Sequence, residues 1–126
     1  MNTKDRGDIA LGVAINYYLS NGFEVSLPIG NKRDYDLIIE QFGVLKRVQV
    51  KFAGVYSDKK KCKVGLRITG GNQSYNYAKK YNDDAFELLF VYTGKGERYN
   101  IPWNEVNCRN EISIETRKWQ KYKITI

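Results

Sequence analysis

The sequence predicts an α/β domain in which one N-terminal helix packs on a mixed β-sheet. Residues 4–20 carry apolar side chains close to the helical period, and Asn21-Gly22 is typical of a helix end. Residues 36–51 contain two strand-like runs separated by a short turn at residues 41–43, as expected for a hairpin. Residues 87–92 form the most apolar run, which we interpret as a central buried strand.

The remaining segments predict short elements that extend this arrangement. Thr3 or Asp5 is placed to cap the start of the helix. Residues 74–81 predict a short helix rich in tyrosine, and residues 102–106 predict a single helical turn that begins with proline. Further strands are expected over residues 23–27, 62–69, 98–101, 111–115 and 121–126.

An excess of positive charge is the most informative bulk property. The 126 residues, which suggest one domain over residues 1–126, contain 21 Lys and Arg against 14 Asp and Glu, giving a net charge of +7. This excess favours a polyanionic partner, and nucleic acid in particular. The chain contains no histidine, which excludes Ser-His and Cys-His catalysis and histidine-dependent nuclease chemistry.

Cysteine usage and hydropathy point to a cytoplasmic protein. The two cysteines, Cys62 and Cys108, lack the spacing of metal ligands, so free thiols are expected rather than a zinc site. No apolar run approaches the roughly 20 residues of a membrane helix, and the N-terminus has no apolar signal core. We therefore expect a cytoplasmic location and no membrane partner.

The predicted hairpin carries three polar side chains that could form one active site. Asp36 begins its first strand, and Gln49-Val50-Lys51 ends its second strand. Alternation places Gln49 and Lys51 on one face, so the three converge if these strand ends meet at one side of the sheet. Each alone has an ordinary role: Asp36 can cap a turn, Gln49 is a polar strand residue and Lys51 is a solvated strand end. Their joint occurrence at hairpin spacing favours a site.

This combination suits metal-dependent cleavage of a phosphodiester bond. Mg²⁺ prefers hard oxygen ligands, which the Asp36 carboxylate, the Val50 backbone carbonyl and the Gln49 side-chain amide can supply. Such a metal polarises the phosphate and lowers the pKa of a water molecule. Lys51 is then placed to orient the attacking water and to offset developing negative charge. We expect Mg²⁺ as the cofactor, with Ca²⁺ able to take its place without turnover.

Asp36, the Gln49-Val50-Lys51 triplet thirteen positions later and the helix start Gly7-Asp8-Ile9-Ala10 together resemble the PD-(D/E)XK nuclease superfamily. Within it, the pattern is most similar to homing endonucleases of cyanobacterial group I introns and to Holliday-junction-resolvase-like relatives. The resemblance covers most of the chain. It implies a restriction-endonuclease-like α/β fold and Mg²⁺-dependent, site-specific cleavage of double-stranded DNA, with Asp36 and Lys51 catalytic and Gln49 in place of the triplet's acid. It also implies a homo-oligomer, either the tetramer of the homing enzymes or a dimer.

One position departs from the family pattern. Family members usually carry a glutamate that faces the metals, one turn after the glycine that opens Gly7-Asp8-Ile9-Ala10. This chain has Leu11 there, and leucine cannot bind a metal ion or its water. Leu11 is either natural, in a weak member of the family, or an engineered substitution that removes the charge and keeps the volume, and we favour the second. In both cases we expect a chain that binds DNA but cleaves it poorly.

Basic and amide-bearing residues predict where DNA binds. Lysine and arginine neutralise phosphates, and a hairpin over residues 54–75 is expected to enter the major groove, where polar side chains read bases. The candidate DNA-binding residues are Lys32, Arg33, Lys59, Lys60, Lys61, Lys63, Arg67, Asn72, Gln73, Ser74, Lys79 and Lys80. The candidates for base recognition among them are Arg67, Asn72, Gln73 and Ser74.

Three other functions are compatible with parts of this pattern. A basic nucleic-acid-binding module without catalysis has the same charge, and for it Lys51 supplies one phosphate contact only. A Holliday-junction-resolvase-like nuclease has the same site but a different DNA substrate. A purely structural interaction domain predicts no salt-sensitive affinity for DNA. Replacing Lys51 separates the first alternative from a nuclease, because only a nuclease loses cutting while binding persists.

Overall fold

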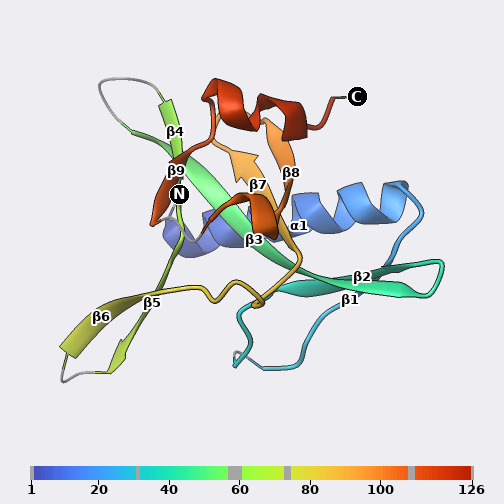
Figure 1. Cartoon of the computed structure of the whole chain (residues 1–126), viewed down its shortest axis with the longest axis horizontal. Helices are drawn as coiled ribbons and strands as arrows, with labels where there is room; N and C mark the ends of the chain where they lie inside the picture. Colours follow the sequence, from blue (N-terminus) through green and yellow to red (C-terminus); the bar gives the residue numbers. More distant parts are fainter. Residues whose placement is uncertain (1, 31, 57–60, 73–74, 108–109, 126) are drawn as a thin grey trace.

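In the computed structural model, which describes residues 2–30, 32–56, 61–72, 75–107 and 110–125, one helix lies across a mixed β-sheet (Figure 1). This helix, α1 (Thr3–Ser20), runs behind the sheet in that view. The sheet contains seven strands of the described residues: β1 (Glu24–Ser26), β2 (Leu37–Gln41), β3 (Val44–Tyr56), β4 (Lys61–Gly65), β7 (Leu88–Thr93), β8 (Arg98–Pro102) and β9 (Glu111–Ser113).

Three smaller elements complete the fold. A two-stranded arm, β5 (Arg67–Asn72) and β6 (Tyr75–Lys80), extends away from the sheet in Figure 1. Two short 3-10 helices, η2 (Trp103–Glu105) and η3 (Arg117–Tyr122), follow β8 and β9. The predicted α/β fold, with an N-terminal helix packed on a mixed sheet, is confirmed. None of the helices in the described ranges has both the length and the hydropathy needed to cross a membrane.

β3 is the longest strand and joins the rest of the sheet together. Along one edge, residues 48–53 of β3 pair in parallel with β7. Along the other edge, β3 pairs antiparallel first with β2, as far as Val48, and then with β4, starting at Gly54. Among the described strands, residues 49–53 therefore have a neighbour on one edge only. We call this segment the open stretch of β3.

The turn between β2 and β3 fixes their register. Gln41 lies opposite Val44, which leaves Phe42 and Gly43 as a two-residue loop with φ angles of 54° and 80°. Turns with positive φ at both residues match the right-handed twist of a strand pair, and glycine adopts this conformation without strain. The predicted hairpin is confirmed, but its turn is one residue shorter than the expected residues 41–43, because Gln41 pairs with Val44. The register decides which β3 residues lie opposite the start of β2.

Two apolar clusters cover the two faces of the sheet, because neighbouring residues of a strand point to opposite faces. On the helix face, α1 packs against a cluster that contains Val48, Val50 and Phe90. On the other face, Leu89 and Val91 belong to a larger cluster that β4, β9, η2 and η3 complete. The predicted central strand over residues 87–92 is confirmed as β7, which contributes to both clusters.

The boundaries of α1 differ slightly from expectation at its start. The predicted caps, Thr3 and Asp5, are wrong: the Asn2 side chain accepts a hydrogen bond of 2.8 Å from the backbone N–H of Asp5. The reason is that α1 already begins at Thr3, so the capping residue must precede it. The predicted end is confirmed, since Gly22 follows the helix with a φ of 85°.

The segment between β4 and β7 departs most from prediction. Residues 74–81 do not form a helix, because the tyrosine-rich segment pairs with β5 as β6. The predicted strand over residues 62–69 is two strands, which belong to different sheets and are separated by the fully buried Leu66. The groove-reading hairpin expected over residues 54–75 is consequently the β5–β6 arm, over residues 67–80.

The C-terminal segment also differs. Residues 121–126 are predicted as a strand, but η3 extends to Tyr122. The described end of the chain pairs with β8 through an isolated bridge, Tyr99 opposite Lys123, and the Ile124 N–H donates to the Arg98 carbonyl at 2.7 Å. The indole of Trp119 is buried in the larger cluster, and this burial holds the segment as a helical turn rather than as an edge strand.

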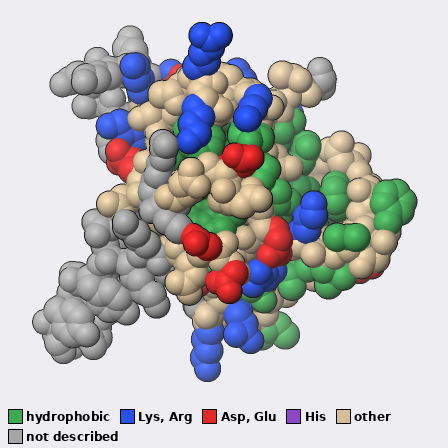
Figure 2. Space-filling view, viewed as in Figure 1, with side chains coloured by type: hydrophobic (Ala, Val, Ile, Leu, Met, Phe, Trp, Pro, Cys, Tyr) green, Lys and Arg blue, Asp and Glu red, His purple; other side chains and the backbone are tan. Residues whose placement is uncertain are grey.

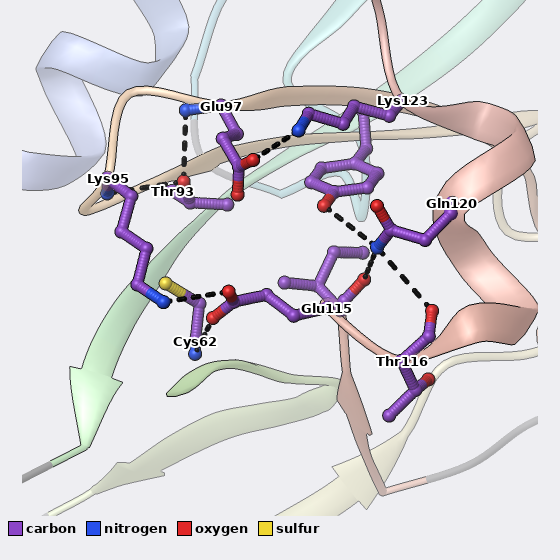
Figure 3. A network of polar contacts seen from close by, with 10 residues as sticks. Cys62, Thr93, Lys95, Glu97, Glu115, Thr116, Gln120 and Lys123 are labelled. Atoms are coloured by element: carbon purple, nitrogen blue, oxygen red, sulfur yellow. Dashed lines mark hydrogen bonds and ion pairs between the residues drawn. The ribbon is translucent and has the colours of Figure 1, made fainter. Parts of the chain in front are cut away.

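A polar network ties the C-terminal segment to β4 and to the β7–β8 turn (Figure 3). The Glu115 carboxylate accepts hydrogen bonds from the backbone N–H of Cys62, at 2.6 Å, and from Lys95 Nζ, at 2.7 Å. Gln120 Nε2 donates to the Tyr99 hydroxyl at 3.2 Å. Cys62 is a buried free thiol, as expected, while Cys108 lies outside the described residues.

This network predicts an acid-sensitive contribution to stability. The ion pair with Lys95 and the Cys62 N–H lower the pKa of Glu115. A lowered pKa means that the stabilisation is complete above the ordinary glutamate pKa, near 4.3, and is lost as the pH falls through the folded-state value. Glu115→Gln should therefore reduce the free energy of unfolding by about 1 kcal/mol at neutral pH. Urea unfolding of the parent and the variant at several pH values measures this difference in unfolding free energy.

Glu105→Gln is the matched control, since Glu105 is exposed on η2. It should leave the unfolding free energy unchanged at every pH. A deficit of Glu115→Gln that is as large at pH 3 as at pH 7 would contradict the role given to the carboxylate.

Candidate active site

The candidate site lies where β2 begins beside the open stretch of β3. The backbone N–H of Asp36 donates to the Val48 carbonyl at 2.8 Å, and the backbone N–H of Val50 donates to Asp36 Oδ2, also at 2.8 Å. Asp36 thus continues the strand ladder by one bond through its backbone and by a second bond through its side chain. These two bonds fix the carboxylate against the exposed edge of β3.

The hairpin register brings the amide of Gln49 to the same place. Leu37 lies opposite Val48, so one step further Asp36 lies opposite Gln49. Gln49 is only 8% exposed, and its Nε2 lies 3.5 Å from the Val50 carbonyl oxygen. The Val48 carbonyl points toward β2, and alternate residues point to the same edge, so the Val50 carbonyl points toward the open edge. No strand accompanies β3 at that point to use it fully.

Lys51 lies on the same face as Gln49. In the parallel register these two residues accompany Leu89 and Val91, which belong to the cluster on the face away from α1. Lys51 Nζ lies 5.3 Å from the centre of the Tyr81 ring, close enough for a cation–π contact. No ion pair in the described part of the chain involves Lys51. Its ammonium is therefore available to a phosphate.

Tyr81 gives Lys51 a rigid support that sequence reasoning missed. It directly follows β6 and is buried, and its ring makes edge-to-face contacts with Phe86 at 5.2 Å and Trp103 at 5.9 Å. The base of the β5–β6 arm is thereby anchored in the core next to the lysine. Ten tyrosines in the sequence give no signal that this one lies under Lys51, because the contact joins distant segments.

Burial dominates the electrostatics of Asp36. It raises the pKa of the Asp36 carboxyl, while the hydrogen bond from Val50 and the charge of Lys51 act in the opposite direction. A nearby cation would favour the ionised form. The available donors are a carboxylate, a carbonyl and an amide, all hard oxygens that fit Mg²⁺ or Ca²⁺. The described residues contain no group of three or more His, Cys, Asp and Glu side chains, so the donor set carries little charge.

Leu11 is placed apart from these groups. It is partly buried on α1 and packs against the cluster that contains Val48 and Val50. That cluster occupies the helix face, whereas Gln49 and Lys51 belong to the opposite face. The structure therefore brings Asp36, the Gln49 amide and the Val50 carbonyl to one edge of β3, and it places Leu11 on the helix side of that edge.

The candidate DNA-binding residues before Asp36 line an open hollow. Lys32 and Arg33 are exposed and border it together with Tyr35 and Arg47. The Arg47 guanidinium lies 5.9 Å from the Tyr35 ring centre and is ion-paired with Glu87. Figure 2 shows lysine and arginine side chains gathered along the lower rim of this face, near the loop that precedes β2.

The other candidates lie on β4 and on the arm. Lys61 is exposed at the start of β4, and Lys63 forms an ion pair of 3.7 Å with Glu111. The backbone places four candidates on the β5–β6 arm: Arg67, Asn72, Lys79 and Lys80. Four others lie outside the described residues: Lys59, Lys60, Gln73 and Ser74.

Comparisons with known proteins agree with this architecture. The model of a family described as PD-(D/E)XK endonuclease matches residues 1–125. The solved structure of a bacterial homing endonuclease, I-Ssp6803I, is similar to this chain, with a TM-score of 0.85 and 28% sequence identity. The similarity covers 98% of this chain and 89% of that protein. No curated protein sequence matches the chain significantly.

The raised pKa of Asp36 predicts a site that costs stability when no metal is present. A raised pKa favours the neutral acid, so this contribution to stability is complete below the ordinary aspartate pKa and is lost as the pH rises through the folded-state value. Asp36→Asn keeps an oxygen that can accept the Val50 N–H and removes the charge. In metal-free buffer at neutral pH, the variant should unfold at a higher temperature than the parent.

The difference should disappear when the pH falls below the ordinary aspartate pKa of about 3.9. Glu40→Gln, an exposed change on β2, which Asp36 directly precedes, serves as the control and should match the parent. Thermal unfolding followed by circular dichroism measures all three proteins. An Asp36→Asn variant that is less stable than the parent at neutral pH would refute the prediction.

Proposed function

This chain belongs to the PD-(D/E)XK endonuclease family, and we propose that it cuts both strands of DNA at a specific sequence with Mg²⁺ bound at the open stretch of β3. The family makes the chain a DNA endonuclease. The observation that carries the more specific proposal is the Asp36 carboxylate, which is fixed by the Val50 N–H beside a carbonyl that no strand accompanies.

Three oxygens of the chain would hold the metal: the Asp36 carboxylate, the Val50 carbonyl and the Gln49 side-chain oxygen. Such a donor set suits Mg²⁺, and Ca²⁺ would compete for it. When bound, the ion supplies Lewis-acid polarisation of the scissile phosphate and acidification of water. The carboxylate is held in place before any ion binds, because its bond to Val50 belongs to the strand ladder. This preorganisation lowers the entropic cost of forming the site.

Lys51 would act on the phosphate itself. Its ammonium lies on the face of Gln49, supported by the Tyr81 ring at 5.3 Å, with no carboxylate partner among the described residues. From there it offsets the negative charge that develops on the phosphate oxygens and helps to orient the attacking water. The Lys51 side chain would need little rearrangement to act on the phosphate, because the Tyr81 ring already holds it in place.

DNA would lie across the open edge of β3, with Lys51 and the base of the arm on one side of that edge. Lys32, Arg33 and Lys61 are exposed cations that can neutralise phosphates. A two-stranded ribbon has the dimensions of the major groove, and we propose that the β5–β6 arm reads bases through Arg67, Asn72, Gln73 and Ser74. The remaining candidates, Lys59, Lys60, Lys63, Lys79 and Lys80, would contact phosphates.

Cutting both strands requires more than one copy of the site, so we propose a homo-oligomer that acts as an intron-homing enzyme, with a tetramer favoured over a dimer. The structural neighbour is named as a homing endonuclease, which supports this substrate class. Apolar side chains are exposed at the β2–β3 turn: Phe42 is 94%, Leu45 61% and Val44 57% exposed. Figure 2 shows hydrophobic side chains gathered over this end of the molecule, a surface suited to a second copy.

We also propose that Leu11 limits cleavage. Leu11→Glu would add a carboxylate on the helix side of the open edge and should increase the rate of DNA cleavage with Mg²⁺ by roughly tenfold or more. Leu11→Gln, which has the same size without the charge, should show no gain. Cleavage of plasmid DNA and of intron-homing-site DNA measures the rates. A parent chain that cuts as fast as Leu11→Glu would exclude position 11 from the site.

The role of Lys51 is tested in the Leu11→Glu protein. Adding Lys51→Ala should reduce the cleavage rate by roughly 100-fold or more, because a charge positioned for the transition state is lost. DNA affinity measured with Ca²⁺ should change by only about threefold, the effect of one phosphate contact. Lys46→Ala, at an exposed position of the same strand, is the control for lost charge. Cutting that survives Lys51→Ala while Lys46→Ala behaves the same would remove the lysine from the mechanism.

A further inference from the structure

A second hollow lies next to the open stretch of β3, on the helix face. It has a volume of about 450 Å³ and is bordered by Arg6 from the first turns of α1, by Phe52 and Gly54 of β3, and by Tyr92 and Thr93 of β7. None of these residues belongs to the candidate metal site. The hollow lies over residues 52–55 of β3 and residues 92–94 at the end of β7, and it starts two residues past Val50 along β3.

Arg6 is the only cation that borders this hollow in the described part of the chain, and its position is defined. The guanidinium carbon lies 5.7 Å from the centre of the Phe52 ring, and Phe52 makes an edge-to-face contact with Tyr92 at 6.1 Å. Arg6 Nη1 would lie 3.9 Å from a Cβ placed on Gly54, an ordinary contact distance. The Phe52 ring, itself packed against Tyr92, therefore supports the guanidinium beside the hollow.

The charge of Arg6 has no protein partner in the described residues. No ion pair and no side-chain hydrogen bond joins Arg6 to another described residue, and the ring contact uses only the face of the guanidinium. The N–H groups at its edge are the groups that bind phosphate oxygens in a fork. Arg6 is exposed, so this edge is open to a ligand that arrives from solvent.

The spacing along β3 relates Arg6 to the candidate metal site. Phe52 follows Val50 by two residues and points to the same face, at a distance of roughly 7 Å along the strand. This distance is comparable to the step between neighbouring phosphates of one DNA strand. A strand whose scissile phosphate lies at Asp36 and the Val50 carbonyl, and which passes from that edge toward the helix face, would present its next phosphate to Arg6 above Phe52.

We propose that Arg6 binds the DNA phosphate adjacent to the scissile one and so positions the cleaved strand on β3. The ligand is a backbone phosphodiester, bound through the guanidinium edge while Phe52 holds the guanidinium face. Arg6 is a positioning residue in this scheme, because it does not touch the reacting atoms. The inference rests on the proposed function, since it takes the open stretch of β3 as the place of cleavage.

The chain supplies a matched control for the experiment. Arg98, at the start of β8, also stacks on an aromatic ring: its guanidinium carbon lies 5.7 Å from the centre of the Tyr17 ring. Arg98 likewise forms no ion pair among the described residues. Tyr17 lies near the far end of α1, away from the open stretch. Arg6→Gln and Arg98→Gln thus remove the same charge and the same kind of contact at two places.

The measurement is the affinity for labelled duplex DNA carrying the homing site, with Ca²⁺ in place of Mg²⁺, over a series of salt concentrations. Arg6→Gln should weaken binding by roughly tenfold. The slope of log affinity against log salt should fall by about 0.9, the contribution of one phosphate contact. Arg6→Lys should keep the slope and lose only part of the affinity. Arg98→Gln should stay within about twofold of the parent with an unchanged slope.

The outcomes separate the inference from the proposed function. Equal effects of Arg6→Gln and Arg98→Gln, in proteins with equal thermal unfolding, would overturn the role of Arg6 and leave the nuclease proposal standing. A parent that shows no salt-dependent binding of any duplex would overturn the proposed function first. If Arg6→Gln alone unfolds, Arg6→Lys becomes the deciding variant. Its salt slope must then match that of the parent while its DNA affinity falls.

Discussion

The exchange of neighbours along one edge of β3 is the constraint on which the rest of the molecule depends. The pairing of β3 with β2 ends at Val48, and its pairing with β4 starts at Gly54. Among the described strands, one edge of β3 is therefore unpaired between these residues, in the middle of the sheet. Backbone groups at such an edge must find other partners. One of them, the Val50 N–H, donates to the Asp36 carboxylate, and the carbonyl of the same residue accepts a long contact of 3.5 Å from Gln49 Nε2.

The two faces of the sheet differ in chemical character on either side of that edge. The helix face is apolar under α1 and carries Arg6 only at its end, while the opposite face carries Gln49 and Lys51 above a large aromatic core. Burial raises the pKa of Asp36 and so disfavours its ionised form in the free protein, a pattern expected where local stability is sacrificed to function. Ion pairs elsewhere, such as Lys95 with Glu115, hold the outer elements in place.

Prediction from the sequence succeeded where the signal was local. The period of residues 4–20, the turn at Phe42-Gly43 and the apolar run of β7 are each encoded within a few neighbouring residues, and all three are confirmed. The tyrosine-rich segment misled the prediction because its side chains fit a short helix as well as a strand. This segment forms a strand because it pairs with β5, and no local sequence pattern encodes that pairing. The expected place of Lys51 on one face with Gln49 follows from alternation, but its support by Tyr81 does not.

The sequence by itself determined the family pattern and the hairpin that carries Asp36 and Gln49, because a glycine-containing turn between two strand-like runs is a local signal. Only the tertiary structure decided that this meeting point is an open edge, that Leu11 lies on its helix side and that Arg6 borders a hollow beside it. The reason is that each of these facts depends on where β4, β7 and α1 pack against β3. Such contacts join residues far apart in the chain, and packing of whole faces, rather than local preference, selects them.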